Sequence, residues 1–413
     1  MKTYILAALF LSSTLLASCK QDDPDSPDPV EGGTEQTDSA SVENNAPNTN
    51  YAPAFAGQTR IRSVQTRAQY TSRILTEQLS SPWGITTLPD GRLLITQKSG
   101  QMRIVNTSGA IVASITGLPA VNASGQGGLL GLCIDPAFET NRQVYWVFSQ
   151  AVSGGTLTAV GRGRLFTDET RIESPTVIYQ ATPAFNSSAH YGGRILFDRT
   201  GHLLVSTGER SSTVTRPQAQ SLNSGLGKIV RITRDGESAA DNPFAGQAGA
   251  RHEIFSLGHR NPQGLALHPV TGELWQSEHG PRGGDEINRV QAGQNYGWPT
   301  ITYGIEYSGQ PVGDAIQQRD GLQQPAYYWD PVISPSGMTF FNGTTIQEWQ
   351  NNLFIGSLSG MHIARLVIEN NRIVGEERLL ADQNQRFRDI TQGSDGALYA
   401  ITDGGRLYRI GSN

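Results

Sequence analysis

Residues 277–288 combine glycine, proline and acidic side chains in a pattern that suits calcium binding. Three acids, Glu278, Asp285 and Glu286, stand among three glycines and Pro281. Glycine and proline bend the backbone so that carbonyl oxygens can turn inward, and the acids supply anionic oxygen. Oxygen ligands on an irregular backbone are what Ca²⁺ selects. A solvated acidic turn is the alternative, but such a turn rarely carries so much glycine, so we expect a metal-binding loop.

A recurring hairpin pattern indicates the elements that must position this loop. An apolar strand, a turn and a second apolar strand follow one another six times, and the turn is often Asp-Gly or an equivalent. The copies occupy residues 83–96, 128–147, 193–206, 263–275, 336–356 and 389–401. Six such units in an all-β chain predict a six-bladed β-propeller with four-stranded blades. A β-sandwich would not need this recurrence.

Further polar residues stand at the ends of these hairpins, where the inner loops of a propeller converge on one mouth. His190 precedes the copy at 193–206 and Glu209 follows it. Arg260 precedes the next copy, and the pair Arg386 and Arg388 precedes the last. We therefore expect the chemistry at this mouth.

The first residues of the chain predict an exported lipoprotein. Residues 1–18 contain a short apolar run that resembles a signal peptide, and it ends in a lipobox-like sequence before Cys19. An ordinary cleaved secretory signal is the alternative. Residues 19–58 are rich in polar residues and proline, which predicts a disordered tether. Residues 59–413 then form the propeller, lipid-anchored in the bacterial cell envelope, at the outer membrane on its periplasmic side or at the cell surface.

The charge of the chain limits the molecules that it can bind, and its cysteine content limits the disulfides that it can form. The net charge is −5 and no basic cluster occurs, which argues against nucleic acid and leaves the lipid anchor as the contact with a membrane. Once Cys19 is lipidated, Cys133 has no partner for an intramolecular disulfide. It lies in an apolar run, so we expect a core thiol.

Five short motifs, taken in order, resemble a known family. They occupy residues 190–194, 260–264, 278–288, 295–299 and 386–389. Together they closely resemble the soluble PQQ-dependent aldose sugar dehydrogenases, the glucose/sorbosone dehydrogenase family, over roughly residues 70–410. The resemblance implies a six-bladed propeller that holds pyrroloquinoline quinone (PQQ) and Ca²⁺. It implies oxidation of an aldose or oligosaccharide at the anomeric carbon to the lactone, with an unknown electron acceptor.

The same resemblance assigns roles to individual residues. His190 corresponds to the base that takes the hydroxyl proton, and Glu209 to the carboxylate that orients it. The positions that match cofactor-binding residues are Gln126, Arg260, Asn261, Tyr307, Arg386 and Arg388. The carbonyls of Gly280 and Pro281 match ligands of the cofactor's calcium. Glu286 and Tyr296, the latter through its carbonyl, match a calcium site in the same loop.

One position departs from the family pattern. Residues 353–359 match a segment that usually ends in a cofactor-binding lysine, and Ser359 stands in its place beside Ser357 and Leu358. We expect these three residues at the cofactor site, with one positive charge fewer. Two other functions stay open at this point: a calcium-dependent sugar lactonase, whose metal ligands come from several blades, and a non-catalytic glycan-binding propeller.

Overall fold

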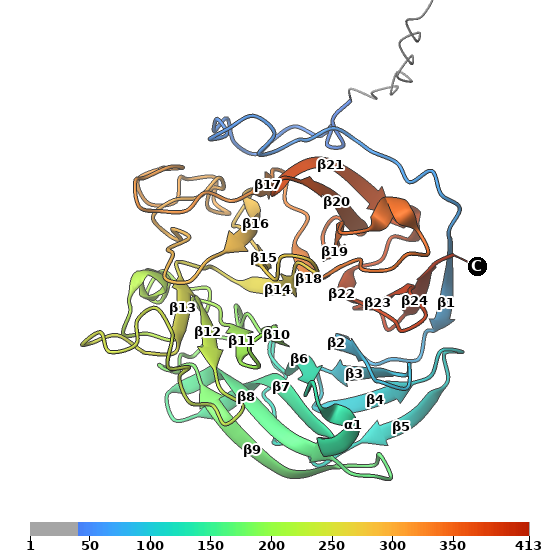
Figure 1. Cartoon of the computed structure of the whole chain (residues 1–413). Coiled ribbons are helices and arrows are strands. Elements are labelled where there is room, and N and C mark those ends of the chain that lie inside the picture. The colour runs from blue at the N-terminus through green and yellow to red at the C-terminus, as the bar shows by residue number, and fades with distance from the viewer. Residues whose placement is uncertain (1–39, 413) are drawn as a thin grey trace, which may run out of the picture. The chain divides into compact units, whose positions relative to one another are not determined.

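The computed structural model describes residues 40–412 of the chain. The predicted signal peptide, Cys19 and most of the predicted tether lie outside these residues. Within them, 24 strands form six antiparallel sheets of four strands each. Figure 1 shows the sheets around a common centre, with β2, β6, β10, β14, β18 and β22 facing it. The prediction of a six-bladed β-propeller is confirmed.

The first three blades follow the chain in order. The first contains β2 (Pro82–Thr87), β3 (Leu93–Gln97), β4 (Gln101–Val105) and β5 (Ile111–Ile115). The second contains β6 (Leu129–Ile134), β7 (Gln143–Val152), β8 (Gly155–Leu165) and β9 (Ile172–Gln180), with the helical turn α1 (Phe138–Asn141) between β6 and β7. The third contains β10 (Ile195–Phe197), β11 (Leu203–Ser206), β12 (Lys228–Ile232) and β13 (Ile254–Leu257), with η1 (Arg216–Gln220) before β12.

The remaining blades complete the ring. The fourth contains β14 (Pro262–Leu267), β15 (Leu274–Glu278), β16 (Asp285–Val290) and β17 (Tyr327–Trp329). The fifth contains β18 (Pro335–Phe340), β19 (Leu353–Ser357), β20 (Ile363–Glu369) and β21 (Arg372–Leu379), with the short turns η2 (Gln347–Trp349) and η3 (Ala381–Gln383) nearby. The sixth contains β22 (Phe387–Gln392), β23 (Leu398–Thr402), β24 (Leu407–Gly411) and β1 (Thr71–Thr76), so a strand from the start of the propeller closes its last blade.

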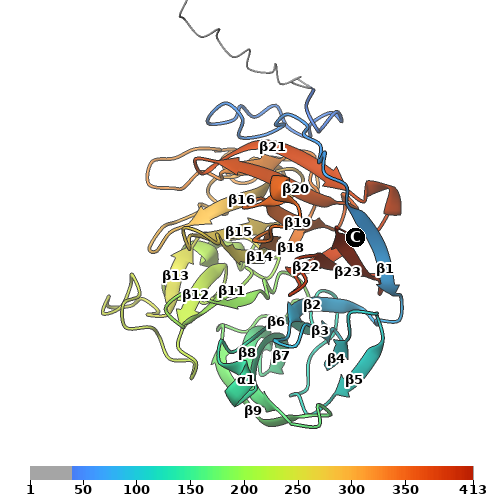
Figure 2. The ribbon, with the colours of Figure 1, turned by 45° about the vertical axis from the view of Figure 1, so that its right-hand side comes forward.

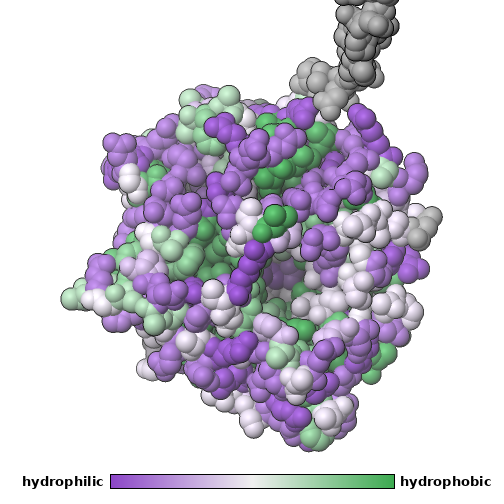
Figure 3. Space-filling view, in the orientation of Figure 1, coloured by the Kyte–Doolittle hydropathy of each residue, from purple (hydrophilic) through white to green (hydrophobic). Residues whose placement is uncertain are grey.

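All six predicted hairpins form the inner two strands of a blade. The alternation of side chains places one apolar face of each sheet against the next blade. One core cluster, for example, joins Leu94 and Ile104 of the first blade to Trp146 and Phe148 of the second. Hydrophilic residues dominate the face in the space-filling view, which is hollowed at its centre (Figure 3). No helix within residues 40–412 is long and apolar enough to cross a membrane.

Residues 40–58, the described part of the predicted tether, lie against the ring. The Asp330 carboxylate accepts hydrogen bonds from the backbone N–H groups of Asn48 and Thr49, at 2.8 and 3.0 Å. Further along, Ser63 bridges to Glu376 of β21, and Figure 2 shows this segment running along β21 before it enters β1. The segment buries little apolar surface, but long-range hydrogen bonds fix it to the ring. Residues 48 and 49 of the predicted tether are therefore in contact with the ring.

Candidate active site

A histidine–carboxylate pair lies at the start of the third blade. His190 is in the connection from β9 to β10, and Glu209 lies three residues after the end of β11. Because β10 and β11 pair antiparallel, the residues before one strand meet those after the other. His190 Nδ1 and Glu209 Oε1 are 2.5 Å apart, and the two residues are 6% and 1% exposed. Since the carboxylate accepts the Nδ1 proton, Nε2 of the imidazole is left as a proton acceptor.

The backbone of His190 is held in an unusual conformation. Its φ of 49° lies in the left-handed region, which costs an ordinary residue roughly 1–2 kcal/mol. Gln126 Oε1 accepts the His190 N–H at 2.8 Å, and the His190 carbonyl accepts the backbone N–H of Arg210 at 3.3 Å. These contacts over-determine the position of the imidazole, as is typical of functional sites.

Electrostatics keep this imidazole neutral near neutral pH. Burial and, after it, the positive charge of Arg260 lower the pKa of His190 to about 4, although the Glu209 carboxylate acts in the opposite direction. A neutral imidazole can accept a proton from a bound hydroxyl group. The pair thus has the form of a general base with an orienting carboxylate.

Arg260 and Asn261 place hydrogen-bond donors without partners close to the His190–Glu209 pair. Arg260 donates its backbone N–H to Glu278 Oε2 at 2.7 Å and Nη1 to the His279 carbonyl at 3.0 Å. Asn261 Oδ1 accepts the Gly192 N–H at 3.0 Å. Arg260 Nε and Asn261 Nδ2 are buried without a hydrogen-bond partner among residues 40–412. Buried donors without partners are costly, so this arrangement suits a ligand with carboxylate or carbonyl oxygens.

Arg386 and Arg388 flank the first residue of β22, and they share one carboxylate. Asp403, in the turn between β23 and β24, accepts Arg386 Nε at 2.9 Å and Arg388 Nε at 2.8 Å. Arg388 also donates Nη1 to Gln263 Oε1 at 2.8 Å. Two guanidinium groups on one carboxylate leave one positive charge in excess. Arg388, Arg260 and His190 all act on the pKa of buried His279, so these groups share one neighbourhood.

The predicted calcium loop lies beside Arg260. A cavity of about 10 Å³, room for one water-sized sphere, is lined by Glu278, Gly280, Glu286 and Tyr296 among others. Burial and the neighbouring Glu278 carboxylate raise the pKa of Glu286 well above its usual value. Asn288 Nδ2 donates to both carboxylates, at 3.3 and 3.0 Å, and compensates only part of their charge.

Backbone oxygens complete the case for a cation in this loop. The carbonyls of Gly280, Pro281 and Tyr296 accept no hydrogen bond within residues 40–412. The Tyr296 hydroxyl, in contrast, donates to the Arg289 carbonyl at 2.6 Å. No group of three or more His, Cys, Asp or Glu side chains in the described part of the chain is arranged to hold a metal. A bound ion would therefore depend on carbonyl oxygens and at most two carboxylates, which Ca²⁺ accepts.

Three predicted cofactor residues do not offer their side chains to this site. Ser357 is fully buried and donates its hydroxyl to the Ile333 carbonyl at 2.9 Å, and Leu358 is 3% exposed. Tyr307 is 72% exposed, and its hydroxyl has no hydrogen bond to residues 40–412. Ser359 shares a hydrogen bond of 2.8 Å with the Ser334 hydroxyl.

The structure adds residues that sequence reasoning missed. Arg210 is fully buried, with its guanidinium 3.7 Å from the centre of the Tyr191 ring and a donated bond to the Ala189 carbonyl at 3.1 Å. It therefore holds both neighbours of His190. The position of Arg210 directly after Glu209 in the sequence is the one feature that could have indicated its role.

A second missed pair crosses the centre of the ring. Arg194, just before β10, forms an ion pair with Asp389 of β22 and lies 4.6 Å from the centre of the Trp83 ring of β2. Asp389 also accepts the backbone N–H of Ile85 at 3.0 Å. The pair links the first, third and sixth blades beneath the mouth.

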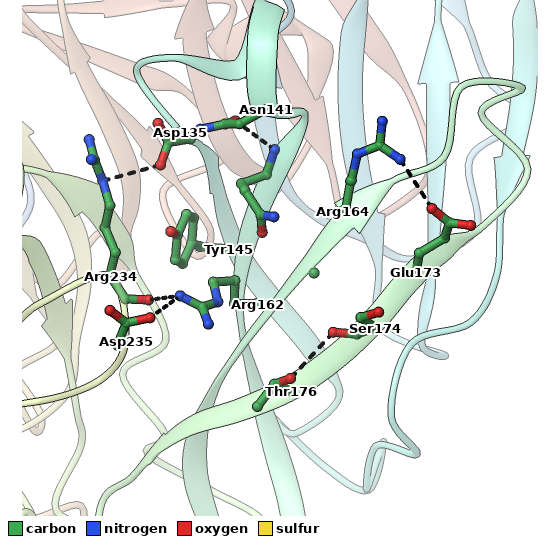
Figure 4. A pocket seen from close by; sticks show the side chains of 12 residues that line it. Asp135, Asn141, Tyr145, Arg162, Arg164, Glu173, Ser174, Thr176, Arg234 and Asp235 are labelled. Atoms are coloured by element: carbon green, nitrogen blue, oxygen red, sulfur yellow. Dashed lines mark hydrogen bonds and ion pairs between the residues drawn. The ribbon is translucent and has the colours of Figure 1, made fainter.

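A larger cavity, of about 570 Å³, lies elsewhere, along β7, β8 and β9 of the second blade (Figure 4). Its charges are balanced, since Arg162 pairs with Asp235, Arg164 with Glu173 and Arg234 with Asp135. It contains no histidine and no unpaired arginine. We therefore place the candidate active site around His190 in spite of the larger volume here.

Comparisons with known proteins all find sugar dehydrogenases. A family model described as Glucose / Sorbosone dehydrogenase matches residues 79–409. Aldose sugar dehydrogenase YliI of Escherichia coli (strain K12) is 40% identical over 342 residues, which cover 82% of this chain and 91% of that protein. A crystal structure of a glucose dehydrogenase is 43% identical with a TM-score of 0.80, and the match covers 83% of this chain and 99% of that chain.

A further solved structure is the PQQ-bound form of an aldose sugar dehydrogenase from Streptomyces coelicolor. It is 26% identical with a TM-score of 0.69, and the match covers 84% of this chain and 99% of that chain. The residues that the family model matches include all the predicted site residues, from Gln126 to Arg388.

Proposed function

The chain belongs to the glucose/sorbosone dehydrogenase family and is a sugar dehydrogenase of the PQQ-dependent type, and from this premise we propose that it oxidises aldoses at the anomeric carbon to the lactone with PQQ and Ca²⁺ as cofactors. When bound, PQQ would accept the hydride from the sugar and Ca²⁺ would act as a Lewis acid. The residues of the chain bind these groups, orient the sugar and remove its proton.

His190 is the proposed base. Its free Nε2 takes the proton of the anomeric hydroxyl, because Nδ1–H is committed to Glu209. As the imidazole becomes positively charged, the Glu209 carboxylate 2.5 Å away stabilises it. Arg210 keeps the loop of His190 in position through the Ala189 carbonyl and the Tyr191 ring.

PQQ fits the donors at the mouth because it carries three carboxylates. Arg260, Arg386 and Arg388 are the proposed partners, since a guanidinium group can pair with a carboxylate through two parallel bonds. Asn261 and Gln126 would complete the set, and the unpaired Arg260 Nε and Asn261 Nδ2 support this assignment. Tyr307 is a weaker candidate, because its exposed ring would have to fold over the mouth.

Ca²⁺ fits the loop that follows β15. The free carbonyls of Gly280 and Pro281 would serve the cofactor's calcium, while Glu286 and the Tyr296 carbonyl would bind calcium in the cavity beside Glu278. In this proposal the ion balances the buried charge of Glu278 and Glu286.

The observation that carries the proposal is the buried His190–Glu209 pair beside Arg260, whose Nε is unpaired. Adding PQQ and Ca²⁺ to the apo-protein and following dye reduction with a panel of aldoses tests it. We expect reduction that depends on PQQ, on Ca²⁺ and on an aldose. If a lactone is hydrolysed while no dye is reduced, the protein is a lactonase and the proposed dehydrogenase activity is wrong. Sugar binding without either reaction indicates a glycan-binding propeller.

We also propose that the mature protein is lipid-anchored at Cys19 in the cell envelope. The support is the sequence of residues 1–19 alone. Mass spectrometry of the N-terminal peptide should detect a lipid on Cys19, and Cys19→Ser should release the protein into the soluble fraction. A soluble parent protein with an unmodified N-terminal peptide would exclude the anchor.

A further inference from the structure

Lys98 is a positively charged residue to which the proposed function gives no role. It lies in the turn between β3 and β4, half-buried, and Nζ donates to the Gly125 carbonyl at 2.7 Å. No carboxylate of residues 40–412 pairs with it. Residues 40–412 contain one other lysine, Lys228, which is fully buried and bonded to three backbone carbonyls.

The backbone around Lys98 is fixed at the seam between the first and second blades. Its N–H donates to the Ser81 carbonyl and its carbonyl accepts the Leu129 N–H, each at 3.1 Å. The carbonyl that its ammonium contacts belongs to Gly125, and the next residue, Gln126, holds the His190 N–H. The ammonium group is therefore attached to the same loop that positions the proposed base.

A second positive charge lies close to this ammonium. Burial lowers the pKa of Lys98, and the guanidinium of Arg388 lowers it further, while Asp403 acts in the opposite direction. Asp403 is already bonded to both Arg386 and Arg388. Lys98, Arg386 and Arg388 thus have one carboxylate nearby, Asp403, and it is bonded to the two arginines. Like charges that are held together with too little counter-charge destabilise the apo-protein and create a site for an anion.

We propose that Lys98 binds a carboxylate of PQQ together with Arg388, and so supplies, from the first blade, the positive charge that Ser359 in the fifth blade cannot supply. This inference rests on the proposed function. The backbone contacts on both sides of Lys98 would hold its stem in place, so that little ordering is needed when the cofactor binds.

The test is a calorimetric titration of the full-length apo-protein with PQQ in the presence of Ca²⁺. Lys98→Met removes the charge and keeps the length, so we expect PQQ binding to weaken roughly 10- to 150-fold, the range for loss of a charge-assisted hydrogen bond. Lys98→Arg should recover most of the affinity. Arg67→Met, which removes an exposed charge outside the mouth, is the matched control and should bind as the parent does. Thermal unfolding of each apo-variant verifies that it is folded.

Amine labelling gives an independent reading, because Lys228 is buried and Lys98 is the one half-exposed lysine of residues 40–412. PQQ should slow the acetylation of Lys98, as measured by mass spectrometry of its peptide. If the parent binds PQQ but Lys98→Met binds equally well and Lys98 is not protected, this inference is wrong and the proposed function stands. If the parent does not bind PQQ, both this inference and the proposed function are wrong.

Discussion

Replacing Glu209 with glutamine isolates the electrostatic part of the proposed base. Glu209→Gln keeps the size of the side chain and the bond from Ser211 N–H, which Oε1 accepts at 3.1 Å. It removes the charge that opposes burial and Arg260 in setting the pKa of His190. A hydrogen bond to a charged group contributes about 1.5–3 kcal/mol, which corresponds to roughly a 10- to 150-fold loss in kcat. The amide can also donate to Nδ1 and move the imidazole proton to Nε2, and a wrong tautomer of this kind raises the loss toward 10⁴-fold.

Steady-state dye reduction by the reconstituted enzyme measures this loss, and titration with PQQ measures cofactor affinity separately. We expect kcat to fall about 10- to 10⁴-fold and PQQ affinity to stay near that of the parent. Unchanged kcat would refute the orienting role of Glu209. A loss of activity that higher PQQ concentrations restore would show that Glu209 holds the cofactor site together instead.

Three further predictions concern the metal, pH and Ser359. Exhaustive chelation should lower both the Tm and the activity, and Ca²⁺ should restore both, because an ion that binds only the folded state stabilises it by about 2.7 kcal/mol at 100 times its Kd; an unchanged Tm would contradict the calcium loop. Since the pKa of His190 is about 4 in the folded protein and near 6.5 in an unfolded chain, the unfolded state binds more protons between these values, so the free energy of unfolding should fall by up to roughly 3 kcal/mol as the pH drops from 6.5 to 4. His190→Gln should flatten that part of the stability curve in urea unfolding, and an identical curve would remove His190 as its cause. Ser359→Lys should tighten PQQ binding about 10- to 150-fold, and Arg386→Ala or Arg388→Ala should weaken it by a similar factor; equal affinity in all three variants would place the cofactor elsewhere.

Local patterns in the sequence were sufficient to predict the ring and to place His190 and Glu209 at the two ends of one hairpin, while the role of His190 as base came from the resemblance to the family. Each inner hairpin carries its own turn and alternation, as in residues 193–206, so no distant contact is needed to recognise it. The pairing of β10 with β11 then brings His190 and Glu209 together from 19 residues apart. The calcium loop is equally local, because its carbonyls and acids lie within 20 residues.

Features that depend on distant partners could not be predicted in this way. Asp403 looks like a turn residue in the sequence. Only the pairing of β22 with β23 shows that it forms ion pairs with Arg386 and Arg388. Residues 48 and 49 have the composition of a disordered chain, yet Asp330, about 280 residues away, binds them. Burial is also a property of the assembled ring: Arg210 has no apolar neighbours in sequence, and its guanidinium is buried against Tyr191.

Single-turnover reduction of PQQ bound to the protein tests the proposed role of the mouth most directly. Parent and His190→Ala are each loaded with PQQ and Ca²⁺ and mixed with an aldose that the parent oxidises, and the absorbance of the quinone is followed. We expect the parent to reduce its cofactor, and His190→Ala to bind PQQ with nearly unchanged affinity but to reduce it about 10²- to 10⁴-fold more slowly, as for loss of a general base. Equal rates of reduction in the two proteins would contradict His190 as the base.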